Sequence, residues 1–218
     1  MTTKASKVEF FVIGTGDIFI DWGDGKKNSN LNDAFYDEPH KQFVFTREYS
    51  GTTPRNIAIN GNITRLDCTY NGLTDLNVSG CAGLRSLTCY TNTLTTLDVS
   101  KNTALEELLL DNNQLTNLDV SNNTALKILS CDDNRLIHLN LSVANTALFS
   151  LYCAYNQLTA SALNDLFRAL PDLTKNEGYD AVRNPGQIFI QGNSGSAVSN
   201  QSIALEKGWK FGIYRNRL

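Results

Sequence analysis

The chain has 218 residues, of which 41% are hydrophobic, and its formal net charge is -3 with an isoelectric point near 5.4. This length suffices for one continuous core or two small ones. The lack of a Lys/Arg-rich run argues against nucleic-acid binding, and no run of about 18 apolar residues predicts membrane insertion. Residues 1–7 lack an apolar segment, so we expect either a cytoplasmic protein or one whose export signal is missing from this sequence.

The first part of the chain is typical of β structure. Four apolar or alternating segments predict strands, at residues 8–13, 17–22, 42–46 and 55–59. Between the first two, Gly14-Thr15-Gly16 predicts a hairpin turn; a dinucleotide loop is the weaker alternative, because Phe19 replaces its third glycine. Asp21 and Asp24 flank a second glycine turn, and a cation site is the weaker reading there because the distal Glu of a calcium loop is missing.

From Ile63 onward a pattern of about 21 residues recurs five times along the chain. Its second leucine column contains Leu66, Leu87, Leu108, Leu129 and Leu151. A unit this short cannot fold alone, so each copy must bury its apolar face against the next, which predicts a solenoid. The spacing L-x-x-L-x-L-x-x-N-x-L is the signature of a leucine-rich repeat.

One asparagine recurs in every unit, and the column consists of Asn71, Asn92, Asn113, Asn134 and Asn156. At this position the chain must turn, and an inward amide can bond the backbone groups that the turn exposes. We therefore interpret the column as a structural ladder and not as a set of catalytic residues.

Four of the five cysteines recur at one apolar position, where the third unit has a leucine; they are Cys68, Cys89, Cys131 and Cys153. A position that accepts either residue type belongs to the core, so we expect buried thiols. Parallel side chains on adjacent strands also give poor disulfide geometry. Cys81 is expected in an outer loop, as the one cysteine that reacts or pairs, and the sequence leaves its redox state open.

The second half of each unit predicts another extended segment, because Leu97 and Val99 alternate with polar residues. No unit has room for a full helix. We therefore predict parallel strands on the concave face of the solenoid and short extended segments on its convex face.

The end of the chain predicts a cap of mixed type. Residues 161–170 have helical spacing, with Ser161 as N-cap and Pro171 after the end. A strand at 187–191, a helix at 200–207 and an edge strand at 208–211 follow, and residues 175–184 predict a mobile loop. The fold class is therefore an α+β repeat solenoid with three parts, a β cap at 1–62, five repeats at 63–158 and an α/β cap at 159–218.

The concave face carries the candidate ligand-binding residues. Strand alternation points one transverse row outward, formed by Asp67, Thr88, Leu109, Ser130 and Tyr152. On and beside this row we predict a site made of Tyr70, Tyr90, Asp111, Asp132, Asp133, Tyr152 and Tyr155. Tyrosine with carboxylates suits either a sugar or a basic protein surface. A solvated face without any ligand is the alternative.

Two resemblances to known families follow from these motifs. The unit L-T-x-L-D-V-S-x-N-T-A-L, carried by residues 94–134, resembles the short leucine-rich repeats of surface and secreted proteins of gut anaerobic bacteria, and it is more distantly similar to internalin-type repeats. The segment Asp21-Trp22-Gly23-Asp24-Gly25 resembles the W-G-D-G turn of PKD-like immunoglobulin-fold modules. The first resemblance implies an exported adhesion or recognition protein, and the second implies a PKD-like N-terminal cap.

Together these patterns predict an extracellular or cell-surface binding module whose ligand is a protein or a carbohydrate. The alternative is a structural spacer within a longer surface protein. We expect no enzyme, because His40 and His138 lack partners at zinc spacing and no hydrolase motif occurs. We also expect no metal and no cofactor, and we expect a monomer.

Overall fold

The computed structural model describes residues 1–25, 29–30, 34–49, 55–175 and 186–213. The N-terminal strands are β1 (Thr2–Thr3), β2 (Lys7–Asp21), β3 (Ser29–Asn30), β4 (Phe35–Asp37), β5 (Gln42–Glu48), β6 (Arg55–Asn56) and β7 (Ala58–Asp67). The repeat strands are β8 (Leu73–Asp75), β9 (Ser86–Thr88), β10 (Glu107–Leu109), β11 (Asn117–Asp119), β12 (Ile128–Ser130), β13 (His138–Asn140) and β14 (Ser150–Tyr152). The C-terminal elements are α1 (Ala160–Ala169), a 3-10 turn (Leu173–Lys175), β15 (Gly186–Phe189), α2 (Ser202–Leu205) and β16 (Trp209–Phe211).

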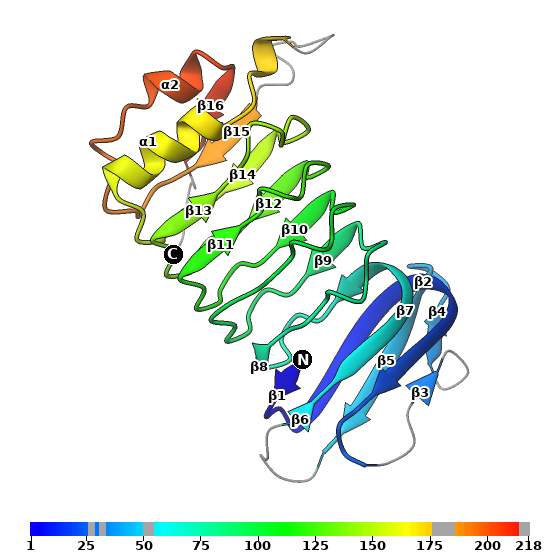
Figure 1. Ribbon diagram of the computed structural model, residues 1–218. Coiled ribbons are helices and arrows are strands. Elements are labelled where there is room, and N and C mark those ends of the chain that lie inside the picture. The colour runs from blue at the N-terminus through cyan, green and yellow to red at the C-terminus, as the bar shows by residue number, and fades with distance from the viewer. Residues whose placement is uncertain (26–28, 31–33, 50–54, 176–185, 214–218) are drawn as a thin grey trace.

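One long β-sheet runs through the molecule (Figure 1). Among the described residues it has eleven strands, ten of them in the order β16-β15-β14-β12-β10-β9-β7-β2-β5-β4, with β3 beside β2. From β7 to β16 each strand pairs parallel with its neighbour, whereas β2 pairs antiparallel with β5 and β7. The predicted stack of in-register parallel strands is therefore confirmed.

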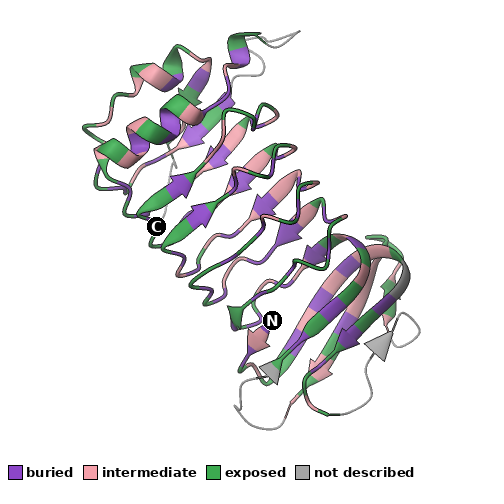
Figure 2. Cartoon of the chain, viewed as in Figure 1, coloured by how far each residue is buried: buried purple, intermediate pink, exposed green. Residues whose placement is uncertain are grey.

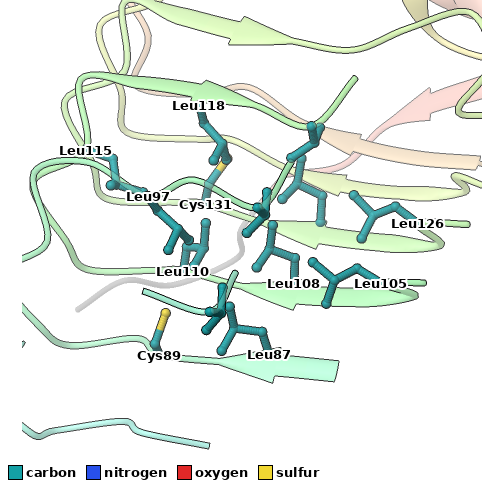
Figure 3. Packing of buried hydrophobic residues seen from close by; sticks show 14 of the residues in the cluster. Leu87, Cys89, Leu97, Leu105, Leu108, Leu110, Leu115, Leu118, Leu126 and Cys131 are labelled. Atoms are coloured by element: carbon teal, nitrogen blue, oxygen red, sulfur yellow. The ribbon is translucent and has the colours of Figure 1, made fainter. Parts of the chain in front are cut away.

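The core of the repeats is a column of leucines between two layers of short strands (Figure 3). Leu87, Leu108 and Leu129 occupy equivalent positions on β9, β10 and β12, and none of the three has exposed surface. The central leucine of each of these strands is buried, and the residues on either side of it are partly buried, except for Thr88 on β9, which is also buried (Figure 2). One side of each strand thus faces the core, and the other side points away from it.

The opposite side of the stack carries the second extended segments. Strands β11 and β13 pair parallel there, and a single bridge joins Asn77 to Asp98 in the preceding units. Leu118 and Leu139, at the centres of β11 and β13, point into the same core. The predicted second layer of extended segments is confirmed.

The N-terminal sheet differs from the sequence prediction at Gly14-Thr15-Gly16. The predicted hairpin turn is wrong, because β2 continues as one strand from Lys7 to Asp21. Its register against β7 shifts twice, after Ile13 and after Thr15, so the glycine segment forms bulges. A side chain at Gly14 would clash with the carbonyl oxygen of Asn62, 2.5 Å from the position of a Cβ. Glycine therefore allows the two backbones to approach closely there.

The W-G-D-G turn anchors the N-terminal sheet. Trp22 is buried and stacks on Phe10, with ring centroids 5.7 Å apart. Asp24 forms a two-pronged ion pair with Arg47, whose Nε lies 2.9 Å from the carboxylate, and Tyr49 donates a hydrogen bond to the carbonyl of Trp22. Gly23 has a φ of 65°, which favours glycine. Asp24 thus holds the turn by bonding an arginine.

Strand β7 joins the N-terminal sheet to the repeats. It pairs antiparallel with β2 on one side and parallel with β9 on the other. Further contacts cross the same junction: the amide of Glu9 donates to the side chain of Asn71, which donates back to the carbonyl of Glu9. The expected boundary between residues 62 and 63 falls inside β7, and the three-part division stays a prediction.

From Asn92 onward, each asparagine of the predicted column bonds its own turn and the preceding one, whereas Asn71 bonds its own turn and Glu9 of β2. Asn113 is representative: its Nδ2 donates to the carbonyls of Leu110 and Cys89, both at 3.0 Å, and its Oδ1 accepts from the amide of Leu94 at 3.0 Å. The side chains of Asn92, Asn134 and Asn156 make the same set of bonds. Each rung therefore links two consecutive turns of the solenoid.

A second asparagine ladder, which the sequence analysis missed, lies on the other side of the core. Asn102, Asn123 and Asn145 are fully buried and donate to carbonyls of their preceding unit. Cys81 occupies the same position one unit earlier, and its carbonyl accepts a hydrogen bond from Nδ2 of Asn102. The available signal was the recurrence of Ser-x-Asn-Thr-Ala, which by itself predicts only a surface turn.

All five cysteines of the chain are free and buried. For the four in the repeat column this agrees with expectation. For Cys81 the prediction was wrong, because its residue is only 3% exposed. Burial raises the pKa of the Cys81 thiol above its ordinary value and thereby disfavours the reactive thiolate.

The C-terminal part continues the stack after an inserted helix. Helix α1 begins one residue earlier than predicted, and its N-cap is Thr159 instead of Ser161, since the Thr159 side chain accepts from the amide of Ala162. The predicted strands are confirmed as β15 and as β16, which ends the sheet. Most of the expected loop at 175–184 lies outside the described residues. Helix α1 packs beside β13, and α2 packs beside β16 and α1 (Figure 1).

Candidate binding surface

The solvent-facing side of the long sheet is the candidate site, and we name it the sheet face. Strand pairing aligns nine residues across it, of which Thr88 is buried, and we name them the central row: Phe35, Val44, Phe11, Asp67, Thr88, Leu109, Ser130, Tyr152 and Phe189. The five middle members are those expected from the sequence. The structure adds three residues of the N-terminal sheet and one of β15, so the face extends beyond the repeats on both sides.

Aromatic rings occupy the C-terminal end of the central row. Tyr152 stacks on Phe189, with ring centroids 4.7 Å apart and planes inclined by 11°. Beyond this pair lies a cavity of about 280 Å³ whose lining includes Phe189, Phe211 and Ile213. The parallel register places the two rings on adjacent strands, where neighbouring side chains lie about 4.8 Å apart. The stack is therefore a direct product of the strand spacing.

The N-terminal end of the central row is also apolar. Phe35 on the edge strand β4 is 70% exposed, and Val44 and Phe11 beside it are partly buried. The sequence analysis did not include these residues. The available signal was the pair Phe10-Phe11, because adjacent residues of a strand point to opposite faces and only Phe10 is needed in the core.

The remaining predicted tyrosines lie at the turn where the strands end. Tyr70 is 73% exposed, and its ring meets that of Tyr90 edge-on with centroids 6.5 Å apart. Tyr155 lies three residues beyond Tyr152 and is exposed. The structure thus places Tyr70 with Tyr90, and Tyr152 with Tyr155, in two groups several strands apart.

The three predicted aspartates do not form a uniformly exposed cluster. The carboxylate of Asp111 accepts from the hydroxyl of Ser130 at 2.6 Å and from the amide of Asp132 at 3.0 Å. Burial raises the pKa of Asp111 above its ordinary value, although these hydrogen bonds oppose the shift. Asp132 is only 3% exposed, and its Oδ1 accepts from the amide of Ala154 at 2.6 Å. Asp132 thus holds the backbone, and Asp111 is the aspartate of this pair that remains partly exposed.

A column of left-handed backbone conformations borders the sheet face. It consists of Tyr70, Thr91, Asn112, Asp133, Tyr155 and Gly192, all with φ between 52° and 76°. Only glycine and, less readily, asparagine or aspartate adopt this conformation at low cost. Each repeat therefore turns in the same way after its strand, and Tyr70, Thr91 and Tyr155 adopt there a conformation that is costly for their residue types.

Two further rows carry charge that the sequence analysis overlooked. Glu107, one row from the centre, accepts from the hydroxyl of Ser86 at 2.8 Å. At the outer edge Glu106 bonds both Arg85 at 2.5 Å and Lys127 at 2.6 Å. These pairs lower the pKa of Glu106, with Lys127 the larger cause. The signal was the 21-residue spacing, which places charges of opposite sign on neighbouring strands.

Two other cavities are lined by residues outside the central row. A cavity of about 430 Å³ lies near the N-terminus between Ile57 and Asn77, and one of about 170 Å³ lies between β13 and α1. Among the described residues no group of three His, Cys, Asp or Glu could hold a metal ion. His138 is exposed, and His40 contacts Asp37 at 2.6 Å. Over the same part of the chain, no helix is both long and apolar enough for a membrane crossing.

The repeating register, the leucine core and the asparagine ladder define a leucine-rich-repeat solenoid. No protein-family model and no curated protein matches the chain. The solved structures that are similar to part of it include two from Listeria monocytogenes. An internalin, InlF, from Listeria monocytogenes strain 4b F2365 is 21% identical, with a TM-score of 0.49 over 68% of this chain and 41% of that one. The functional domain of InlJ from Listeria monocytogenes, which includes a cysteine ladder, is 29% identical, with a TM-score of 0.39 over 66% of this chain and 38% of that one.

Proposed function

We propose that the chain is a binding module that recognises a protein partner through the sheet face. The stacked pair Tyr152 and Phe189 carries this proposal, because it places two large rings on the open side of the sheet. Aromatic residues are favoured at the energetic centres of protein interfaces. A spacer has no need of such rings, since a solenoid face is stable when it is lined by small polar residues.

The wider setting of this module is part of the same proposal. A location outside the cell or on its surface, use in adhesion and a PKD-like N-terminal module follow from the resemblances of the repeats and of the W-G-D-G turn. The match to this chain spans less than half the length of each of the two similar structures. A carbohydrate ligand and the spacer role are the alternatives that the experiment must separate. We propose no catalytic activity and a monomeric state.

A binding screen with matched variants tests the proposal. The protein is applied to a glycan array and to a panel of extracellular-matrix proteins, beside the sheet-face variant Tyr152→Ala/Tyr155→Ala, which changes one residue of the face and one at its border. Val143→Ala is the control, because Val143 is 76% exposed in a turn beyond β13. We expect a matrix protein to bind the unchanged protein. It should bind the sheet-face variant at least about tenfold more weakly. It should bind the control with the same affinity as the unchanged protein.

The other outcomes have defined meanings. Equal binding by all three proteins would place the site outside the sheet face. Binding to glycans alone would favour the carbohydrate ligand. No binding to any probe would favour the spacer.

A further inference from the structure

The sheet face has apolar ends and an acidic middle, which bears on the chemistry of its partner. From Phe35 on β4 to Phe189 on β15 the central row crosses eight strand spacings, or about 38 Å at about 4.8 Å each. Phe35, Val44 and Phe11 form one apolar end, and Tyr152 and Phe189 form the other. A single partner that contacts both ends must therefore reach about 38 Å along the face.

The middle of the face carries carboxylates that the protein itself holds in place. Ser86 donates to Glu107, and Ser130 donates to Asp111, so each carboxylate has one oxygen fixed by a neighbouring hydroxyl. A carboxylate can accept about four hydrogen bonds, which leaves capacity for donors from outside. Within the described part of the chain, no Lys or Arg forms a salt bridge with either Glu107 or Asp111.

The basic residues of the repeats lie beside this middle, at the edge of the sheet and on β7. Glu106, at the edge, already takes up Arg85 and Lys127. In the row that contains Glu107, Arg65 lies on the N-terminal side and Lys210 at the far C-terminal end. The central part therefore has a net negative charge. A cationic group of a partner is attracted to it electrostatically, whereas a neutral or anionic group is not.

Resting on the proposed function, we infer that the partner is a protein segment with Lys or Arg residues between two apolar or aromatic ends. The N-terminal sheet takes part in the same face through Phe35 and Phe11. Neutral sugars can donate hydrogen bonds to these carboxylates but carry no charge to pair with them, and sulfated or sialylated glycans are repelled by them. Cationic side chains flanked by apolar ones match both the charge and the spacing of the face.

Three synthetic peptides of about twelve residues, long enough to span about 38 Å when extended, test this inference. The first has aromatic residues at both ends and Lys and Arg between them. In the second Glu replaces Lys and Arg, and in the third Ser replaces the aromatic residues. Fluorescence anisotropy with the whole protein measures the dissociation constant of each peptide at two salt concentrations.

We expect the first peptide to bind best and its affinity to fall with salt. The isosteric variant Glu107→Gln/Asp111→Asn should weaken it by about threefold to tenfold. Phe35→Ser should weaken it by about tenfold, whereas the exposed control Val143→Ser should not. Circular dichroism melting curves check that every variant folds.

Two results would overturn the inference. One is that the peptide with Glu binds as tightly as the first peptide or more tightly, or that the first peptide binds no more tightly than the other two. The other is unchanged binding by Phe35→Ser, which would remove the N-terminal sheet from the face. Either result leaves the proposed function standing if a matrix protein still depends on Tyr152 and Tyr155, so failures of the two proposals are distinguishable.

Discussion

Leu108 lies at the centre of the middle repeat, with neighbours from the units before and after it and no exposed surface (Figure 3). Replacing it with Ala removes buried methyl groups and leaves a cavity that neighbouring strands cannot close independently. We expect Leu108→Ala to lower the free energy of unfolding by about 2–5 kcal/mol, measured by urea denaturation. Leu109→Ala, on the sheet face, is the control and should cost much less. A loss below about 1 kcal/mol for Leu108→Ala would contradict the packing described here.

At the residue scale, the sequence predicts the burial of apolar residues more reliably than the burial of polar residues. The leucine columns were correct because their period matches the stacking of strands. The recurring Ser-x-Asn-Thr-Ala pattern predicts a surface turn, because polar residues are mostly exposed, yet its Asn102 and Asn123 are buried where carbonyls need donors. The same reasoning misplaced Cys81, which shares their column. Asp132 was expected on an exposed face, but its carboxylate bonds a buried amide.

At the scale of elements, helix α1 offers a sharp comparison between two adjacent capping residues. Thr159 accepts a hydrogen bond from the amide of Ala162, whereas Ser161 lies inside the first turn. We expect Thr159→Ala to destabilise the protein by about 1 kcal/mol and Ser161→Ala to have little effect, both measured by thermal or urea unfolding. The reverse order of the two effects would support the cap that the sequence predicted.

The sequence predicts two strands where the structure has the single strand β2, which shows why some elements cannot be predicted from sequence. A pair of glycines between two apolar segments is compatible with a hairpin or with a bulge. The choice depends on the pairing partner, and β7 lies far along the chain from the segment of β2 that it pairs with. The N-terminal part of the sheet face escaped for the same reason, because the register of β4, β5 and β2 is not encoded in any local pattern.

At the scale of the whole molecule, one core runs from the N-terminal sheet to α1 and encloses every cysteine. Burial raises the pKa of Cys131 and of Cys81, so few thiolates form at neutral pH. We expect iodoacetamide to label none of the five cysteines in the native protein and all five in denaturant, as measured by intact mass. Rapid labelling of Cys81 under native conditions would contradict its burial.

The asparagine ladder continues across an interruption in the repeat. In the repeats, a leucine amide and the asparagine that accepts its bond lie 19 or 20 positions apart, whereas Leu158 and Asn193 lie 35 apart and bond at 2.9 Å all the same. Asn193 then donates to Cys153 and Ile190 as any other rung does. The order of rungs is therefore set by position in space and not by distance along the chain. Asn193 therefore lets β15 extend the sheet face in register with β14, although helix α1 is inserted between the two strands.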